Sequence, residues 1–224
     1  MFIFIKKIFF FFYREYKYSI INLNELFINI TFFFLSIFIF IFAIGPDKEV
    51  LETIGIGIIW SLLLLSSTLS LKKYYYDDFN NNNLILMHMS GFSFEVIAIL
   101  KILCHFLFVQ IPFLISIPIA SLFVNISLEK IYMLITSFLI GSLILSCLGS
   151  ISSSMNLLNN KSYSLGSIIV MVFSIPVIIF SVGIINAQEN FLYLINILLG
   201  ILFIFIAISP WVSSICIKLA LQNN

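Results

Sequence analysis

Long apolar runs, separated by short polar interruptions, make up most of the chain. Six of these runs approach or exceed the ~20 residues that a helix needs to cross the hydrocarbon core of a bilayer. They cover, approximately, Leu26–Ile44, Thr53–Leu71, Val96–Val124, Ile131–Ser152, Leu165–Ile185 and Phe191–Ile217. The pattern therefore predicts an all-α membrane protein with six transmembrane helices.

Prolines and polar segments mark the expected ends and bends of these runs. The first run stops at Gly45-Pro46, after which an acidic turn is expected over residues 47–52. Pro112 and Pro118 are the natural places for a kink in the long third run. A polar loop is expected from Ser153 to Ser164, and the fourth run before it carries small residues on a face that allows close helix packing. Those residues are Gly141, Ser142, Ser146, Gly149 and Ser150.

The first 23 residues are too polar for a span and too short in their apolar stretch for a signal peptide. Only residues 8–13 are continuously apolar before Arg14, Glu15 and Lys17 follow. We predict an interfacial amphipathic helix whose Lys and Arg side chains face the headgroups while its Phe side chains enter the acyl boundary.

The longest polar interruption runs from Ser70 to Gly91, SLKKYYYDDFNNNNLILMHMSG. Charged groups of this kind are costly in hydrocarbon, so the stretch must meet water or a water-facing partner. We expect Met87 and Met89, which flank His88, to form an apolar patch toward a partner, since Met adapts to irregular surfaces. The tract Asn80–Asn83 is expected to be a spacer.

The basic residues indicate the orientation of the six spans. One side of the membrane receives eight Lys and Arg residues and the other receives Lys48 and Lys130. The eight are Lys6, Lys7, Arg14, Lys17, Lys72, Lys73, Lys161 and Lys218. The positive-inside rule then predicts that both termini and the Ser70–Gly91 stretch lie on the cytoplasmic side, or on the matrix side in an organelle.

Composition and motifs narrow the function. Hydrophobic residues account for 62% of the chain and charged residues for 9%, and the net charge of +1 comes without a basic run, so no nucleic-acid partner is expected. Cys104, Cys147 and Cys216 are isolated and are expected to be buried apolar side chains. No phosphate-binding G-x-x-x-x-G-K-[ST] motif occurs. ATP, if it is used, must therefore be bound by another subunit.

Few groups could form a polar site within the membrane. Lys101 and His105 lie at helical spacing in the third run, near Glu95, and could serve as a charge relay or contact an anionic ligand. The alternative is that Lys101 reaches back to the cytoplasmic interface. Neither His88 nor His105 has the neighbours that a metal or haem ligand needs, so we assign no catalytic, cofactor-binding or metal residue. An intramembrane enzyme using Lys101, His105 or Glu95 is a further alternative.

Several blocks of the chain resemble one family. They are IGP at residues 44–46, GIIWSLLLLSSTLSL at 57–71, YYDDF at 75–79, SIPVIIF at 174–180 and SPW at 209–211. With six spans in this order, the chain resembles the CcmB family, the haem exporter protein B of cytochrome c maturation. The block from Gly57 to Phe79 is the specific part of the resemblance.

The resemblance implies an ABC-exporter-type permease, a single transmembrane domain over residues 1–224 in a bacterial inner membrane or a mitochondrial inner membrane. It implies a non-catalytic subunit that works with the ATPase CcmA, with CcmC and CcmD, and indirectly with the haem chaperone CcmE. ATP would act through the ATPase, and haem is a possible cargo of the complex. A generic ABC-type permease for a lipid or another small hydrophobic substrate is the alternative.

Within this picture residues 72–92 are expected to form a cytoplasmic coupling helix that docks on the ATPase. Asp77 and Asp78 would accept hydrogen bonds from basic residues of the partner, and Tyr74 and Met87 would add buried anchors. The predicted contact residues are Lys72, Lys73, Tyr75, Asp77, Asp78 and Phe79. The alternative is a solvated loop with tyrosines at the bilayer surface.

Overall fold

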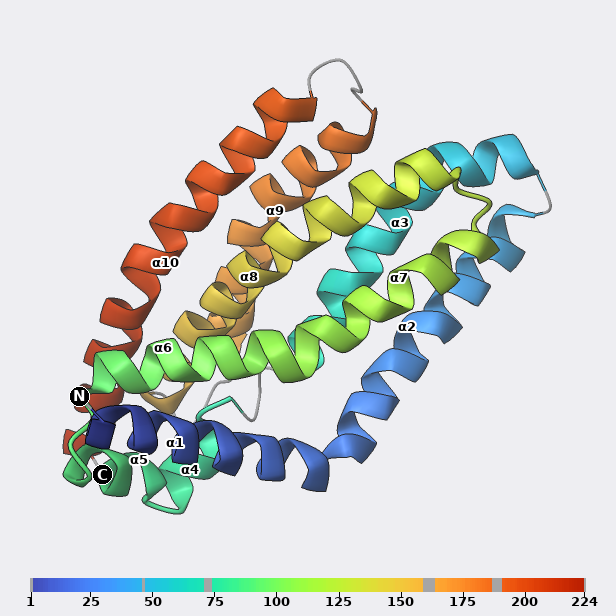
Figure 1. Cartoon of the computed structure of the whole chain (residues 1–224). Coiled ribbons are helices and arrows are strands. Elements are labelled where there is room, and N and C mark those ends of the chain that lie inside the picture. Colours follow the sequence, from blue (N-terminus) through green and yellow to red (C-terminus); the bar gives the residue numbers. More distant parts are fainter. Residues whose placement is uncertain (1, 46, 71–73, 159–163, 187–190, 224) are drawn as a thin grey trace.

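The computed structural model describes residues 2–45, 47–70, 74–158, 164–186 and 191–223. Over these residues the regular structure is helical (Figure 1), and six helices are long and apolar enough to cross a membrane. Both termini lie at the same end of the molecule, as six crossings require. The predicted all-α architecture with six spans is confirmed.

The first two spans are α2, Leu23–Ile44, and α3, Lys48–Leu69. α3 begins five residues before the predicted start, so the expected acidic turn after Asp47 is helical instead. The reason is an N-cap: the Asp47 carboxylate accepts hydrogen bonds from the backbone N–H groups of Glu49 and Val50 at 3.0 and 3.3 Å. An acidic residue in the first turn also suits the helix dipole.

The third span consists of α6, Phe94–His105, a π-helical segment, Phe106–Gln110, and α7, Ile111–Phe123. The irregular segment directly precedes Pro112, whose ring nitrogen cannot donate a hydrogen bond. A π turn is one way in which a helix absorbs such a break. The bend was predicted at the prolines, and the structure places the irregular geometry just before the first of them.

The last three spans are α8, Leu128–Leu158, α9, Ser164–Asn186, and α10, Phe191–Gln222. α8 continues beyond the predicted end at Ser152, so the first part of the expected polar loop is helix. Ser153 and Ser154 are buried, and Ser154 donates to the carbonyl of Ile151 at 2.8 Å. Residues 159–163 of the expected loop lie outside the described residues.

α8 lies at the centre of the bundle, packed against α9 and α10 (Figure 1). Its small residues make this possible, as predicted: Ser142, Ser146 and Ser150 are fully buried, and Gly141 faces Trp60 of α3. A Cβ atom on Gly141 would lie 2.4 Å from the Trp60 ring, so no larger residue fits without displacing the indole. Most hydroxyl groups of these serines donate hydrogen bonds to backbone carbonyls of α8 itself. The Ser146 hydroxyl, for example, donates to the Ser142 carbonyl at 2.9 Å.

The polar elements gather at the end of the bundle that holds both termini. α1, Phe2–Ile21, lies along α6, and the short helices α4, Tyr76–Asn80, and α5, Asn83–Met89, lie beside it (Figure 1). The predicted single coupling helix is thus two helices. Asn82 separates them because it adopts a left-handed conformation with φ 57°, which asparagine tolerates better than most residues.

Candidate functional site

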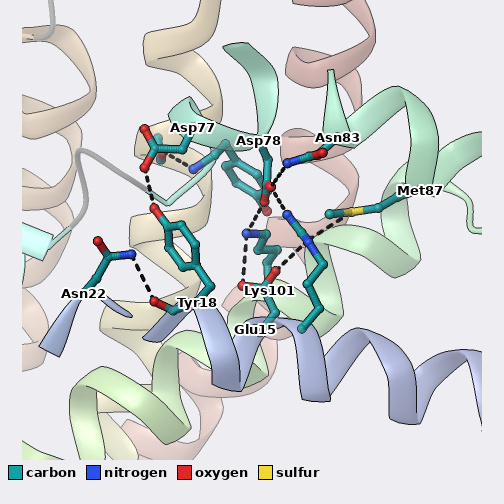
Figure 2. Close-up of polar contacts among 11 residues, drawn as sticks. Glu15, Tyr18, Asn22, Asp77, Asp78, Asn83, Met87 and Lys101 are labelled. Carbon is teal, nitrogen blue, oxygen red and sulfur yellow. Dashed lines mark hydrogen bonds and ion pairs between the residues drawn. The ribbon is translucent and has the colours of Figure 1, made fainter. Parts of the chain in front are cut away.

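A cluster of four charged residues joins three elements that are far apart in the sequence. Arg14 and Glu15 come from α1, Asp78 from α4 and Lys101 from α6. Figure 2 shows Glu15, Asp78 and Lys101 pointing toward one another in the space between these helices. We call these four residues the ion cluster.

Lys101 is the centre of the ion cluster. Its Nζ lies 3.1 Å from Oε2 of Glu15 and contacts Oδ2 of Asp78. The side chains of Lys101, Glu15 and Asp78 are only 7–8% exposed. Lys101 therefore ties α6 to both α1 and α4 in a largely dry environment.

Asp78 accepts from two further donors besides Lys101. The guanidinium of Arg14 contacts its Oδ1, and Asn83 Nδ2 donates to the same oxygen at 3.1 Å. Arg14 also bonds Oε1 of Glu15 at 2.8 Å. Asp78 thereby links α1, α6 and the first residue of α5.

The ion cluster holds two cations and two carboxylates, so its formal charge is zero. Buried ions are tolerated when each is paired and hydrogen-bonded, while removal of one partner leaves an uncompensated charge. Burial alone would raise the pKa of Asp78, but the charges of Lys101 and Arg14 and the hydrogen bonds from Lys101 and Asn83 together lower it below its ordinary value. Asp78 is thus ionised near neutral pH.

A second contact between α1 and α4 lies beside the ion cluster. The hydroxyl of Tyr18 donates to Oδ2 of Asp77 (Figure 2). Burial and this hydrogen bond raise the pKa of Tyr18 above its ordinary value, so the phenol keeps its proton. The two adjacent carboxylates of α4, Asp77 and Asp78, are therefore both bonded to side chains of α1.

A network of uncharged side chains extends from the residues just before α4 into the bundle. We call it the neutral network. His105 bonds the Ser70 hydroxyl through Nε2 at 3.1 Å and the Ser146 hydroxyl through Nδ1 at 3.0 Å. The Tyr74 hydroxyl donates to the Ser146 carbonyl at 3.3 Å, and its ring centroid lies 4.9 Å from that of His105. Both nitrogens of His105 are engaged, so it positions the end of α3 against α8.

Tyr75 makes the deepest contact of this network. Its hydroxyl lies 2.8 Å from the hydroxyl of Ser150, which lies 2.8 Å from that of Ser213 on α10. Its backbone N–H donates to the Ser153 hydroxyl at 3.3 Å. Burial raises the pKa of Tyr75, so the phenol stays neutral. The residue before α4 is thus fixed to α8 and α10.

Most of the residues expected to face an ATPase point into this chain. Tyr75 is fully buried, Phe79 and Asp78 are buried, and Asp77 is half-buried. Lys72 and Lys73 lie outside the described residues. An ATPase contact by this set stays a prediction, and the structure gives three of its members an internal role.

The expected partner-facing patch of Met87 and Met89 is wrong at Met87 and stays a prediction at Met89. Met89 is 78% exposed, but Met87 is buried and its sulfur lies 3.9 Å from Nη1 of Arg14. Helical spacing explains the difference, because residues two apart on α5 point in different directions. Exposed apolar side chains on α4 and α5 are those of Tyr76, Ile85, Leu86 and Met89.

The three candidate residues of the third span, Glu95, Lys101 and His105, take part in three separate sets of contacts. Lys101 does not pair with Glu95: it reaches residues outside the membrane span but is buried there rather than solvated. Glu95 instead accepts hydrogen bonds from Ser214 and, at 2.9 Å, from Lys218, both on α10. Lys101 and His105 share α6, yet one joins the ion cluster and the other the neutral network.

The sequence reasoning missed the contribution of α1. Arg14 was expected to face lipid headgroups, but it turns inward because Asp78 and Glu15 offer two carboxylates. Glu15 was given no role, although a carboxylate inside an apolar, basic helix is a signal for a buried partner. Asn83 was expected to be part of a spacer, but its side-chain amide donates a hydrogen bond to Asp78.

The cysteines and the possible metal ligands complete the set of candidate site residues. No group of three or more His, Cys, Asp or Glu side chains is placed there to hold a metal ion. Cys104, Cys147 and Cys216 are free and buried, which confirms their predicted burial. The contacts that the structure shows at this end of the bundle are ion pairs and hydrogen bonds between helices.

Comparison with known proteins agrees with this architecture. The family model described as CcmB protein matches residues 6–220. Heme exporter protein B of Haemophilus influenzae is 29% identical over 174 residues, which cover 78% of this chain and 79% of that protein. Heme exporter protein B of Rhodobacter capsulatus is 24% identical over 198 residues, covering 87% and 91%. The match spans nearly the whole chain, and the chain belongs to the CcmB family.

Proposed function

We propose that this chain is the non-catalytic membrane subunit of an ABC transporter complex for cytochrome c maturation. ATP would be hydrolysed by a separate subunit, CcmA, and the energy used for haem delivery or for release of the haem-loaded chaperone CcmE. CcmC and CcmD would complete the complex. Membership of the CcmB family and relatives named heme exporter protein B support this proposal.

The ion cluster is the observation that best supports coupling between an ATPase and the membrane spans. It fastens α4 to α1 and to α6 through buried contacts, and Tyr75 fastens the same region to α8 and α10. A displacement of α4 and α5 would therefore be transmitted to the spans through these direct side-chain contacts. This is the arrangement that a subunit driven from outside the membrane needs.

We place the ATPase contact on the exposed side of α4 and α5. Leu86 is 60% and Met89 78% exposed, and neither is used to hold the segment. Exposed apolar side chains beside polar ones are typical of a docking surface. The asparagines at residues 80–82, where α4 meets α5, are also exposed and add polar groups to this side of the chain.

The positive-inside rule supports a cytoplasmic or matrix location for α4, α5 and both termini. The membrane would be a bacterial inner membrane or a mitochondrial inner membrane. We treat residues 1–224 as a single permease domain, with residues 1–23 as its interfacial helix and residues 72–92 as its coupling segment. Haem is assigned as cargo of the complex and not as a resident cofactor.

Replacement of the two exposed side chains tests the docking surface. The variant Leu86→Asp/Met89→Asp is expected to recover at least tenfold less ATPase subunit in co-purification from membranes, because charges replace its apolar contacts. The matched control is Leu128→Asp, an 82% exposed leucine at the first residue of α8, away from α4 and α5. Undiminished ATPase recovery with normal cytochrome c maturation would overturn the proposal.

A further inference from the structure

The outward side of α1 exposes both apolar and basic side chains at the polar end of the bundle (Figure 1). α1 ends at Ile21, and α2, the first span, begins at Leu23. Because this junction is so short, the end of α1 must lie where the first span enters the hydrocarbon, at the surface of the bilayer. The outward side of α1 therefore has lipid as well as water beside it.

Contacts with the rest of the chain fix the rotation of α1. The ring of Phe11 packs edge-on against that of Phe92, with centroids 6.1 Å apart, and Glu15 is buried in the ion cluster. Lys7 Nζ donates to the Ser90 carbonyl at 2.7 Å. These contacts, spread along the helix, decide which of its side chains face outward.

Large apolar side chains form a stripe on the outward side. They follow one another at intervals of three or four residues, which places them on one side of the helix. Their exposed fractions lie between 45% and 68%, and they are Phe9, Tyr13, Tyr16 and Ile20. An exposed apolar stripe next to a membrane span is typical of a helix that lies in the membrane surface and buries the stripe among acyl chains.

The charge of this side of α1 is positive. Lys6 and Lys17 are exposed, and neither forms an ion pair with a residue that the structure describes. They are about three helical turns apart, so both lie along one edge of the apolar stripe. The one carboxylate in the sequence of α1 is that of Glu15, which is buried and paired in the ion cluster.

The neighbouring carboxylates do not neutralise these lysines. Asp77 and Asp78 already bond side chains of α1 and α6, and Glu95 bonds Lys218. Glu25, at the start of α2, has an interaction of its own. The outward side of α1 therefore carries cations without a counter-charge among the described residues, directly beside apolar side chains. This combination matches a molecule that has an anionic headgroup and acyl chains.

We propose that the outward side of α1 binds anionic phospholipids of the bilayer. Lys6 and Lys17 would donate to the phosphate oxygens, and the apolar stripe would lie among the acyl chains. Arg14 takes no part, because its guanidinium bonds carboxylates of the ion cluster. A lipid is favoured over a soluble phosphate because the two lysines border the apolar stripe. This inference does not depend on the proposed transport role.

The test is a lipid titration of the purified full-length chain by native mass spectrometry after delipidation. Phosphatidylglycerol is compared with phosphatidylcholine, which has the same acyl chains and no net charge. We expect phosphatidylglycerol to bind about tenfold more tightly or better, because each lysine near an anionic headgroup contributes about fivefold. The preference should decrease as the ionic strength rises. Glycerol 1-phosphate, the headgroup without acyl chains, is expected not to displace the lipid.

Lysine variants assign the preference to α1. Lys17→Gln is expected to lower the preference for phosphatidylglycerol about fivefold, and Lys17→Arg is expected to keep it, because the charge stays in place. The matched control is Lys48→Gln, which removes an exposed lysine at the first residue of α3, at the end of that helix remote from α1. This control is expected to keep the preference.

A further variant separates the apolar stripe from the charges. Phe9→Ser/Tyr13→Ser is expected to weaken the binding of both lipids while the preference for phosphatidylglycerol is retained, because acyl-chain contacts do not depend on the charge of the headgroup. All the substituted side chains are exposed, so the variants are expected to fold, and their thermal midpoints verify this.

Four results would overturn the proposal. Equal binding of the two lipids would show that anionic headgroups are not recognised. Displacement of the lipid by glycerol 1-phosphate would assign the lysines to a soluble anion. A preference that falls as much in Lys48→Gln as in Lys17→Gln would show that it does not reside on α1. Unchanged lipid binding in Phe9→Ser/Tyr13→Ser would exclude the apolar stripe from the site.

Discussion

Two lysine–carboxylate contacts on α6 have the same chemistry and opposite surroundings. Near the start of the helix Glu95 meets Lys218 at 2.9 Å, with side chains 35% and 48% exposed. Six residues further, Lys101 meets Glu15 and Asp78 with side chains 7–8% exposed. One contact joins two spans at a solvated edge, and the other joins three elements in a nearly dry space.

The difference shows that burial, and not the presence of an ion pair, decides what the contact does. An exposed pair contributes little because water screens both charges. A buried pair adds little net stability compared with an apolar replacement, but the loss of one partner is severe. The ion cluster therefore acts as a device that enforces one arrangement of α1, α4 and α6.

The largest expected effect comes from Asp78→Ala. The substitution leaves Lys101 with Glu15 alone and gives the buried cluster a net positive charge, which is expected to destabilise the chain by about 3–5 kcal/mol. Thermal unfolding of the detergent-purified chain measures it. A loss below about 1 kcal/mol would show that the cluster is solvated.

The second prediction concerns removal of a neutral pair. In Lys101→Met/Asp78→Leu the remaining Arg14 and Glu15 still pair at 2.8 Å, so no charge is left alone. The double variant is expected to be more stable than the sum of the two single changes implies, by about 0.5–3 kcal/mol. Additive losses in the double-mutant cycle would contradict the ion-cluster account.

The pH dependence of Asp78 gives a smaller effect. Its pKa is lowered in the folded chain, so its contribution is complete above the ordinary value of 3.8 and is lost as pH falls through the lower folded value. The stability difference between the wild type and Asp78→Asn is expected to be constant from pH 7 to pH 5 and to shrink only below 3.8. A difference that already declines between pH 7 and pH 5 would mean that the pKa is raised.

The smallest expected effect comes from Lys218→Ala, on the exposed side of the comparison. Loss of its contact with Glu95 is expected to change stability by about 0.2–1 kcal/mol, and the change should decrease further at high salt. Unfolding midpoints at low and high ionic strength provide the measurement. A loss as large as that of Asp78→Ala would remove the distinction between the two contacts.

The six spans and the small-residue packing surface of α8 could be predicted from the sequence alone. Runs of apolar residues define a membrane helix locally, and small residues such as Gly141 and Ser146 are readable as a close-packing face. The predicted helix ends were less accurate. An N-cap such as Asp47 and the burial of Ser153 depend on individual side-chain contacts, which an average of hydropathy over many residues does not contain. The ion cluster was not predictable as a unit, since it needs α1, α4 and α6 to meet.

The assignment of the YYDDF block shows the same limit. The block was predicted to face an ATPase, but polar and aromatic residues look alike in a sequence whether they face a partner or their own chain. Tyr75 and Asp78 turn inward because Ser150 and Lys101 satisfy them there. The better candidates for an outward contact are the exposed side chains of Leu86, which was given no role, and Met89, which was expected to face a partner.

The most direct test of the account is the coupling ratio of the assembled complex, the amount of c-type cytochrome matured per ATP hydrolysed. Asp78→Asn is compared with the wild type and with Lys218→Ala at equal amounts of bound ATPase subunit. The ratio is expected to be at least tenfold lower for Asp78→Asn, with ATPase binding retained, and unchanged for Lys218→Ala. An unchanged ratio in a folded Asp78→Asn complex would contradict the claim that the ion cluster transmits the motion.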